Sequence, residues 1–217
     1  MRNIDFAPGE YYHVFNRGNS KQKLFLDKRD YVRFLFLLLY QQSHVPVYNI
    51  SQAIDYFLKN NSYNVRQKQR IIDERIVELV NFCIMPNHFH ILVKECEENG
   101  ITNYVHRFET GFSKYYNIRY RKSGHVFQGT FKAVHVESNE QLLHLSAYIH
   151  KNPEELMRGQ RGDKYSWSTY RDYAIENRWG DLLVLGAILD QFKNKKEYRT
   201  FVQETHINEK YVENINY

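Results

Sequence analysis

The sequence is poor in cysteine and has no long hydrophobic segment. Its two cysteines, Cys83 and Cys96, do not form a Cys-x-x-Cys pair, so neither a zinc ribbon nor a disulfide framework is indicated. The longest apolar run, residues 34–40, is far too short to cross a bilayer, and the first nine residues lack the apolar core of a signal peptide. We therefore expect no membrane association and a reduced, cytoplasmic setting.

Internal repeats and low-complexity tracts are also absent. The 217 residues are 42% hydrophobic, which is enough for a sizeable core. Lys and Arg number 30 against 25 Asp and Glu, for a net charge of +5, and the aromatic content is 16%. A basic chain rich in flat rings suits an anionic partner such as single-stranded nucleic acid, although the aromatic residues are equally consistent with a ring-rich core.

Short β-rich runs alternate with runs of helical periodicity, which predicts an α+β fold. Pro86-Asn87 separates two of the β-rich runs and indicates a hairpin. The strands are expected at residues 11–17, 77–85, 88–95 and 131–136, and the helices at 31–42, 101–121 and 140–150. This order predicts an antiparallel sheet with helices packed on one face. The polar stretch 49–73, with its basic run 66–70, is interpreted as an insertion.

The hairpin carries the residues with the clearest chemical meaning. His88 and His90 are two residues apart on a predicted strand, so both side chains point to the same face, with Phe89 on the opposite one. Two imidazoles at this spacing can bind one divalent ion. The simpler interpretation, two strand histidines facing solvent, is the more common one for an isolated His-x-His.

Five sequence blocks resemble those of the HUH single-tyrosine transposases, in particular the REP-associated tyrosine transposases. The segment 85–90, Met-Pro-Asn-His-Phe-His, is similar to the family's central histidine motif. The other similar blocks are YHVFNRG at 12–18, GHVFQGTF at 124–131, YIHKNP at 148–153 and YSWSTY at 165–170. The resemblance covers roughly residues 11–173. It implies a ferredoxin- or RRM-like catalytic domain over residues 1–173 and a C-terminal extension over 174–217.

The resemblance also implies an activity. Members of the family cut single-stranded DNA by attack of a tyrosine hydroxyl on a phosphate, which forms a 5′-phosphotyrosine intermediate, and transfer the strand by reversing the step. The family's tyrosine pattern on the helix after the histidine strand corresponds here to residues 112–117. It places the nucleophile at Tyr115. Helical periodicity does not separate Tyr115 from Tyr116, so the second tyrosine stays open.

The metal expected in such a site is Mn²⁺ or Mg²⁺, with His88 and His90 as ligands. The family usually adds a third ligand about one turn after the nucleophile. Four residues after Tyr115 stands Arg119, which cannot bind a metal ion. Oxygen donors elsewhere remain as alternatives: Asn117, Gln128 and Glu95.

The implied partner is single-stranded or hairpin DNA, and a homodimer is an open alternative to a monomer. We expect contacts with DNA from basic and polar residues near the histidine strand and along the tyrosine helix. These are Asn16, Arg17, Lys114, Arg119, Arg121, Lys122 and His125. The usual interpretation of such clusters is a solvated charged face.

Three rival classes were considered. Histidine-triad nucleotide hydrolases need a third histidine at position 92, which is Leu92 here. Two-histidine phosphoesterases need two separated His-x-Ser/Thr elements, and neither His88 nor His90 begins one. A non-catalytic DNA-binding regulator descended from a transposase is the remaining alternative. The intact histidines and Tyr115 argue against simple loss of activity, while the incomplete third-ligand position keeps this alternative open.

Overall fold

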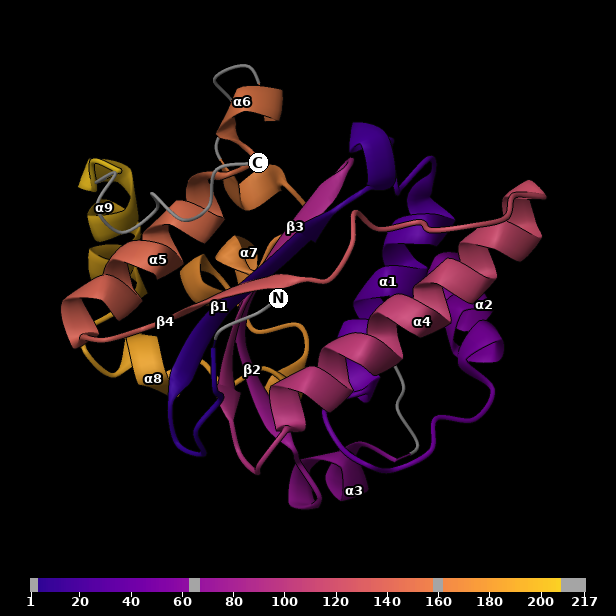
Figure 1. Cartoon of the computed structure of the whole chain (residues 1–217). Helices are drawn as coiled ribbons and strands as arrows, with labels where there is room; N and C mark the ends of the chain where they lie inside the picture. The colour runs from indigo at the N-terminus through magenta and orange to yellow at the C-terminus, as the bar shows by residue number, and fades with distance from the viewer. Residues whose placement is uncertain (1–3, 63–66, 158–161, 208–217) are drawn as a thin grey trace.

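A computed structural model describes residues 4–62, 67–157 and 162–207 of the chain. Its centre is an antiparallel sheet with the strand order β2-β3-β1-β4 (Figure 1). The strands are β1 (Tyr11–Arg17), β2 (Val77–Met85), β3 (His88–Glu95) and β4 (Lys132–His135). The α+β class and the antiparallel sheet predicted from the sequence are confirmed. The first three strands have the predicted bounds, and β4 is one residue shorter at each end.

One face of the sheet packs against two long helices, α1 (Lys28–Tyr40) and α4 (Gly100–Tyr120). Helix α1 begins at Asp27, whose carboxylate accepts from backbone N–H groups of Arg29 and Asp30. Alternate strand residues such as Val14 and Phe89 face these helices and pack with Phe34 of α1. The period of two along the strands and of three to four along the helices brings the apolar residues of both into one core.

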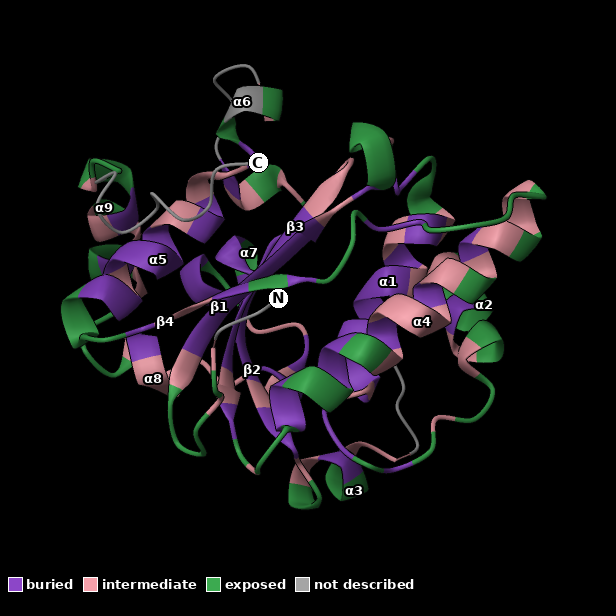
Figure 2. Ribbon diagram, viewed as in Figure 1, coloured by how far each residue is buried: buried purple, intermediate pink, exposed green. Residues whose placement is uncertain are grey.

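The opposite face is also covered, which differs from the expectation that helices pack on one face only. Helix α5 (Asn139–Lys151) lies on β2 and β3, and around it are α7 (Tyr170–Ala174), which also contacts β2, α8 (Gly186–Leu189) and α9 (Lys195–Glu204). Figure 1 shows the sheet between the α1/α4 and α5/α9 layers, and Figure 2 shows that it is largely buried. Leu92 and Cys83 on this face are apolar and fully buried, so they need a cover that a one-sided fold lacks.

The predicted insertion forms two helices, α2 (Ile50–Asn60) and α3 (Lys68–Asp73). Phe57 of α2 packs edge-on against Phe36 of α1, so this segment extends the first helical layer. Arg66, the start of the basic run, lies outside the described residues. Shorter elements complete the chain: the 3₁₀ turns η1 (Asn19–Lys21), η2 (Gly162–Lys164) and η3 (Gly180–Leu182), and helix α6 (Glu154–Met157).

The described part of the C-terminal extension is packed into both layers. Trp179 and Leu182 join the core under α1 and α4, whereas Ile188, Tyr198 and Val202 join the core under α5. Residues 208–217 lie outside the described part. In the ranges that the structure describes, no helix combines the length and apolar character needed to span a membrane.

Candidate active site

His88 and His90 lie together on the face of β3 that α5 covers. Their ring centroids are 5.2 Å apart, with the rings nearly perpendicular. In the antiparallel register Arg17 of β1 is opposite His88 and Phe15 is opposite His90, so all four side chains share this face. His90 is fully buried, while His88 is partly exposed at the end of the strand.

The hairpin turn orients His88. Asn87 places its Oδ1 2.8 Å from Nδ1 of His88, where only a donor hydrogen on Nδ1 makes a favourable contact. This selects the tautomer whose Nε2 carries a lone pair. The backbone of the turn is itself held, because the carbonyl of Asn87 accepts from Gly18 and that of Pro86 accepts from Leu24. The Pro86-Asn87 pair thus does more than reverse the chain: it sets the direction of the first histidine ring.

The second histidine is held by a residue of the neighbouring strand. Nδ1 of His90 is 3.0 Å from Nε2 of His13, and the two rings stack with centroids 5.1 Å apart. His13 is fully buried on β1. The Nε2 atom of His90 is the ring nitrogen that remains on the side away from His13. Both histidines of β3 therefore use Nδ1 for an orienting contact.

Helix α5 brings a tyrosine and an asparagine to the two histidines. It begins at Ser138, whose hydroxyl accepts from the backbone N–H of Gln141, and ends at Asn152 before Pro153. Tyr148 and Asn152 are four residues apart and share one side of the helix. The Tyr148 ring contacts the His90 ring edge-on at 5.5 Å between centroids, and Oδ1 of Asn152 is 3.2 Å from Nε2 of His88.

The donor set fits a divalent cation. Nε2 of His88 and Oδ1 of Asn152 both present lone pairs, which repel at 3.2 Å unless a proton or cation lies between them. Two donors about 2.1 Å from one ion lie roughly 3 Å apart, so this spacing suits shared ligation. Among the described residues no three His, Cys, Asp or Glu side chains are arranged to hold a metal ion, so a third donor beside His88 and His90 would come from another group, such as the amide oxygen of Asn152.

Burial keeps His90 and its neighbour His13 neutral. The pKa of His90 lies well below its usual value because burial disfavours the charged ring, and the neighbouring His13 and His88 lower it further. Burial alone lowers the pKa of His13 to about 3. A neutral imidazole is the form that binds a metal ion, so near neutral pH His90 needs no deprotonation before ligation.

Two cationic side chains share this face at the same end of the sheet. Arg17 is opposite His88, and its Nε hydrogen-bonds to the side-chain oxygen of Gln128. Lys132 on β4 is opposite Phe15, with its Nζ 6.0 Å from the centre of the Phe15 ring. Arg17 was among the predicted DNA contacts, but Lys132 was not. They put positive charge beside the histidines, where a phosphate would need it.

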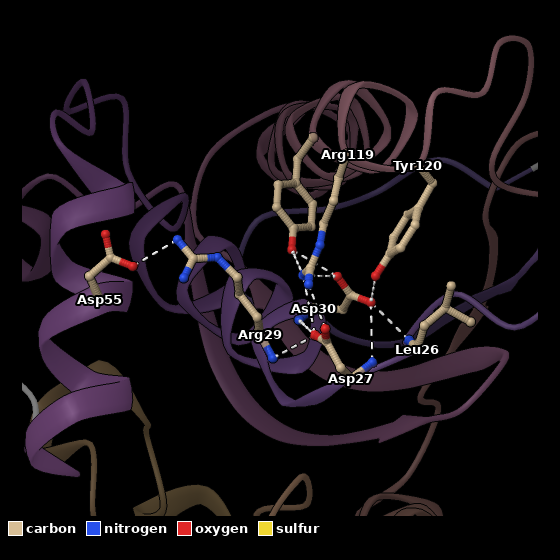
Figure 3. Close-up of polar contacts among 8 residues, drawn as sticks. Leu26, Asp27, Arg29, Asp30, Asp55, Arg119 and Tyr120 are labelled. Atoms are coloured by element: carbon tan, nitrogen blue, oxygen red, sulfur yellow. Dashed lines mark hydrogen bonds and ion pairs between the residues drawn. The ribbon is translucent and has the colours of Figure 1, made fainter.

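Tyr115, the predicted nucleophile, is not near the histidines. It lies on α4, on the other side of the sheet, and its hydroxyl donates to Asp30 at 2.7 Å and accepts from Arg119. Burial and the bond to Asp30 raise the pKa of Tyr115 to about 12, which opposes formation of a phenolate. Figure 3 shows the surrounding cluster, in which Arg119 and Tyr120 reach Asp27 and Asp30 at the start of α1. In this setting Tyr115 helps to join two helices.

The alternative tyrosine and the three candidate third ligands each have another partner in the fold. Tyr116 is buried beside α1 and donates to the carbonyl of Lys23. Glu95 accepts from Gly100 and Ile101 at the start of α4, and Asn117 donates to the carbonyl of Gly124. Gln128 holds Arg17.

The predicted DNA contacts separate into several environments. Asn16 is buried on the α4 side, where its amide donates to Glu109, so it supports the fold. Arg119 is engaged with Asp27 and Asp30. Lys114 and His125 line a polar groove between α4 and the loop before β4. Arg121 and Lys122 are exposed at the end of α4. The groove and Arg17 meet at one end of the sheet, because the loop pairs with residues 17 and 18.

Sequence reasoning missed Tyr148, Asn152 and His13 as site residues. A signal for the first two was present, because Tyr148 and Asn152 have the spacing of one helical turn that was sought for a nucleophile and its metal ligand. The block YIHKNP at 148–153, which contains both residues, counted only toward the family resemblance, without a role for either residue. His13 had no such signal, since its register against β3 depends on the folded sheet.

Comparisons with known proteins bear on the family and the fold of the chain. Residues 65–152 match the family model described as "Transposase IS200 like". No curated protein matches the chain. A solved structure described as a REP associates tyrosine transposase bound to a REP hairpin is similar with a TM-score of 0.52 and 14% identity, over 86% of this chain and 95% of that one. The family resemblance inferred from the sequence is confirmed, and this likeness shows a shared fold.

Proposed function

We propose that this chain cuts and rejoins single-stranded DNA with Tyr148 as the nucleophile. The premise is the confirmed resemblance to the IS200-like transposases. The observation that carries the proposal is the meeting of Tyr148 and Asn152 of α5 with His88 and His90 of β3. The proposed nucleophile is therefore Tyr148 in place of Tyr115, whose hydroxyl is engaged by Asp30 and Arg119 on the other side of the sheet.

In the proposed reaction the hydroxyl oxygen of Tyr148 bonds to the phosphorus of a phosphodiester while the bond from phosphorus to the 3′ oxygen breaks. The phenolic proton is released, and the departing 3′ oxygen takes up a proton to become a hydroxyl. The product is a 5′-phosphotyrosine. Because one phosphodiester-type bond replaces another, a second 3′-hydroxyl can reverse the step and join a new strand. Tyr148 is partly exposed, as attack on a bound strand requires.

Nε2 of His88, Nε2 of His90 and Oδ1 of Asn152 would hold the divalent ion. When bound, the ion supplies Lewis-acid stabilisation of charge on the phosphate oxygens. Two imidazoles favour Mn²⁺ over Mg²⁺, which prefers oxygen ligands. Arg17 and Lys132 would bind the phosphates on either side of the scissile bond through charge-assisted hydrogen bonds.

The proposed substrate is single-stranded DNA or a hairpin with single-stranded flanks. The solved structure with the same fold holds a REP hairpin, which supports a hairpin substrate here. The groove lined by Lys114 and His125 would guide a flank toward the end of the sheet where Arg17 lies. One chain carries every proposed active-site residue, so we propose action as a monomer. A reducing cytoplasmic setting is part of the proposal, since Cys83 and Cys96 are both free.

The test is formation of a covalent adduct between the protein and labelled hairpin DNA from the flanks of its own gene in the presence of Mn²⁺, resolved on denaturing gels. We expect an adduct that is lost in Tyr148→Phe and His88→Ala and kept in Tyr115→Phe. An adduct that survives Tyr148→Phe and disappears in Tyr115→Phe would contradict the assignment. Metal-independent binding of the same DNA without any adduct would favour the non-catalytic regulator.

A further inference from the structure

His13 is a buried histidine that the proposed reaction does not use directly. It lies on β1 with no exposed surface, between the ring of Phe15 and the edge of Tyr148. Its Nε2 is 3.0 Å from Nδ1 of His90, and its own Nδ1 has no hydrogen-bond partner within the described parts of the chain. A fully buried imidazole with one unsatisfied nitrogen needs an explanation, since buried polar atoms are normally paired.

The contact between the two rings constrains where hydrogens can lie. A single hydrogen occupies the space between Nδ1 of His90 and Nε2 of His13, and it belongs to one ring or the other. If His90 binds a cation through Nε2, its only hydrogen is on Nδ1, so His90 donates and His13 accepts. The hydrogen of His13 is then on Nδ1, the atom without a partner. In the reverse arrangement Nε2 of His90 carries a hydrogen and cannot ligate.

The same geometry is repeated at His88 with a different partner. There Oδ1 of Asn87 accepts from Nδ1, and Nε2 is directed toward Asn152. An amide oxygen has no second tautomer, so Asn87 holds His88 permanently in the ligating form. His13 does have a second tautomer, so the hydrogen between the two rings can belong to either of them. The cation itself would therefore make the selection at His90.

We propose that His13 is a positioning residue of the metal site, which accepts the Nδ1 hydrogen of His90, and that cation binding selects this tautomer of the His13–His90 pair. The inference rests on the proposed function, because the bound metal ion is part of that proposal. Partners of this kind orient ligating histidines and raise their basicity, and their loss typically weakens metal affinity 10- to 100-fold.

The first test is titration of the purified full chain with Mn²⁺ by calorimetry. His13→Phe keeps an aromatic ring of similar size against Phe15 and Tyr148 but removes the acceptor, so we expect a roughly 10- to 100-fold weaker affinity. His13→Gln keeps an acceptor oxygen and should recover part of this loss. His135→Gln is the matched control, because His135 is a strand histidine directed toward Tyr12 on the other face. Its affinity should equal that of the wild type.

The second test needs no substitution and so does not depend on how the variants fold. Long-range ¹H–¹⁵N spectra of the wild type with ¹⁵N-labelled histidine report which ring nitrogen carries the hydrogen. With diamagnetic Zn²⁺ bound, we expect His90 and His13 both to be protonated at Nδ1. Without metal, Nδ1 of His90 should lose part of its proton occupancy. A metal-bound spectrum in which Nδ1 of His90 carries no hydrogen would overturn the proposal.

The outcomes separate this inference from the proposed function. If His90→Phe abolishes Mn²⁺ binding but a folded His13→Phe binds as tightly as the wild type, His13 has no positioning role and the metal site stands. If the wild type binds no Mn²⁺, the metal site of the proposed function is wrong, and the role of His13 is wrong with it. Weaker binding in His13→Phe with partial recovery in His13→Gln supports the inference.

Discussion

At the scale of single residues, the contact between Nε2 of His88 and Oδ1 of Asn152 defines the candidate site. It joins a strand to a helix 64 positions later in the chain, and it does so with two lone-pair atoms at 3.2 Å. An amide oxygen adds a ligand without adding charge. The site would thus bind a divalent ion with two neutral rings and a neutral amide, and keep a net positive charge for an incoming phosphate.

Asn152→Ala should weaken Mn²⁺ affinity by about tenfold or more, because it removes one of three protein ligands. Asn152→Asp should bind Mn²⁺ at least as tightly as the wild type, since a carboxylate oxygen replaces the amide oxygen at the same place. Calorimetric titration measures both. Asn117→Ala is the control, because this asparagine bonds to Gly124 away from the histidines. Equal losses in Asn117→Ala and Asn152→Ala would exclude a specific role for Asn152.

A second residue-scale prediction concerns His150, which is buried between Thr169 and Tyr198. Burial lowers its pKa to about 3, so the unfolded chain takes up a proton below pH 6.5 that the folded chain does not. Its contribution to stability is therefore complete above pH 6.5 and is lost as the pH falls toward 3.

The pH dependence of the free energy of unfolding, measured by urea denaturation at pH 6 and pH 5, checks this. His150→Gln should reduce the slope by about 1.4 kcal/mol per pH unit, the free energy that corresponds to one proton. Ile118→Gln changes an exposed residue that does not titrate and should leave the slope as it is. An unchanged slope in His150→Gln would show that this ring titrates normally in the folded chain.

At the scale of elements, helix α5 decides where the proposed nucleophile lies. Four buried polar contacts hold it on the sheet and against α9: Asn81 to Ser146, His150 to Thr169, His150 to Tyr198 and Ser146 to Tyr198. The C-terminal extension, which carries no recognisable motif, thus holds the helix that presents Tyr148 and Asn152. Its packing explains why this face of the sheet is not open.

Tyr198→Phe should lower the free energy of unfolding by about 1–3 kcal/mol, because it leaves Nδ1 of His150 and the Ser146 hydroxyl buried without their shared partner. Urea denaturation at pH 7.5 measures the loss. Tyr48→Phe, at a tyrosine that is 70% exposed, is the control and should change the stability little. A loss below about 0.5 kcal/mol in Tyr198→Phe would mean that water replaces the hydroxyl and that its bonds to His150 and Ser146 add little to stability.

The secondary-structure elements also show which parts of the fold could be predicted from the sequence alone. The β-rich runs 11–17, 77–85 and 88–95 predicted three strands with their correct ends, because β-forming residues and the Pro86-Asn87 turn are local signals. The sequence does not reveal in the same way which helix covers the histidine face of the sheet, because that depends on contacts between distant segments. Tyr115 and Tyr148 both stand on amphipathic helices after the histidine strand, and only the packing of α4 with α1 and of α5 with α9 separates them.

At the scale of the whole molecule, every residue of the proposed site lies in one chain. Tyr148 and His90 are in ring contact, and α5 is enclosed by α7, α8 and α9 of the same chain. If α5, which carries Tyr148, were exchanged with a second subunit, it would have to leave this core. We therefore predict that a mixture of His88→Ala and Tyr148→Phe proteins forms no covalent adduct with DNA. The gel assay above measures it, with wild type diluted into either variant as the control. An adduct in the mixture would show catalysis in trans.

The most direct test of the central claim is to locate the nucleotide on the protein. The wild-type chain is incubated with single-stranded hairpin DNA and Mn²⁺, digested with nuclease and trypsin, and analysed by mass spectrometry for a peptide that carries a nucleotide on tyrosine. We predict modification at Tyr148 and none at Tyr115 or Tyr116. A nucleotide on Tyr115 or Tyr116 would contradict the assignment of the active site to the α5 face of the sheet.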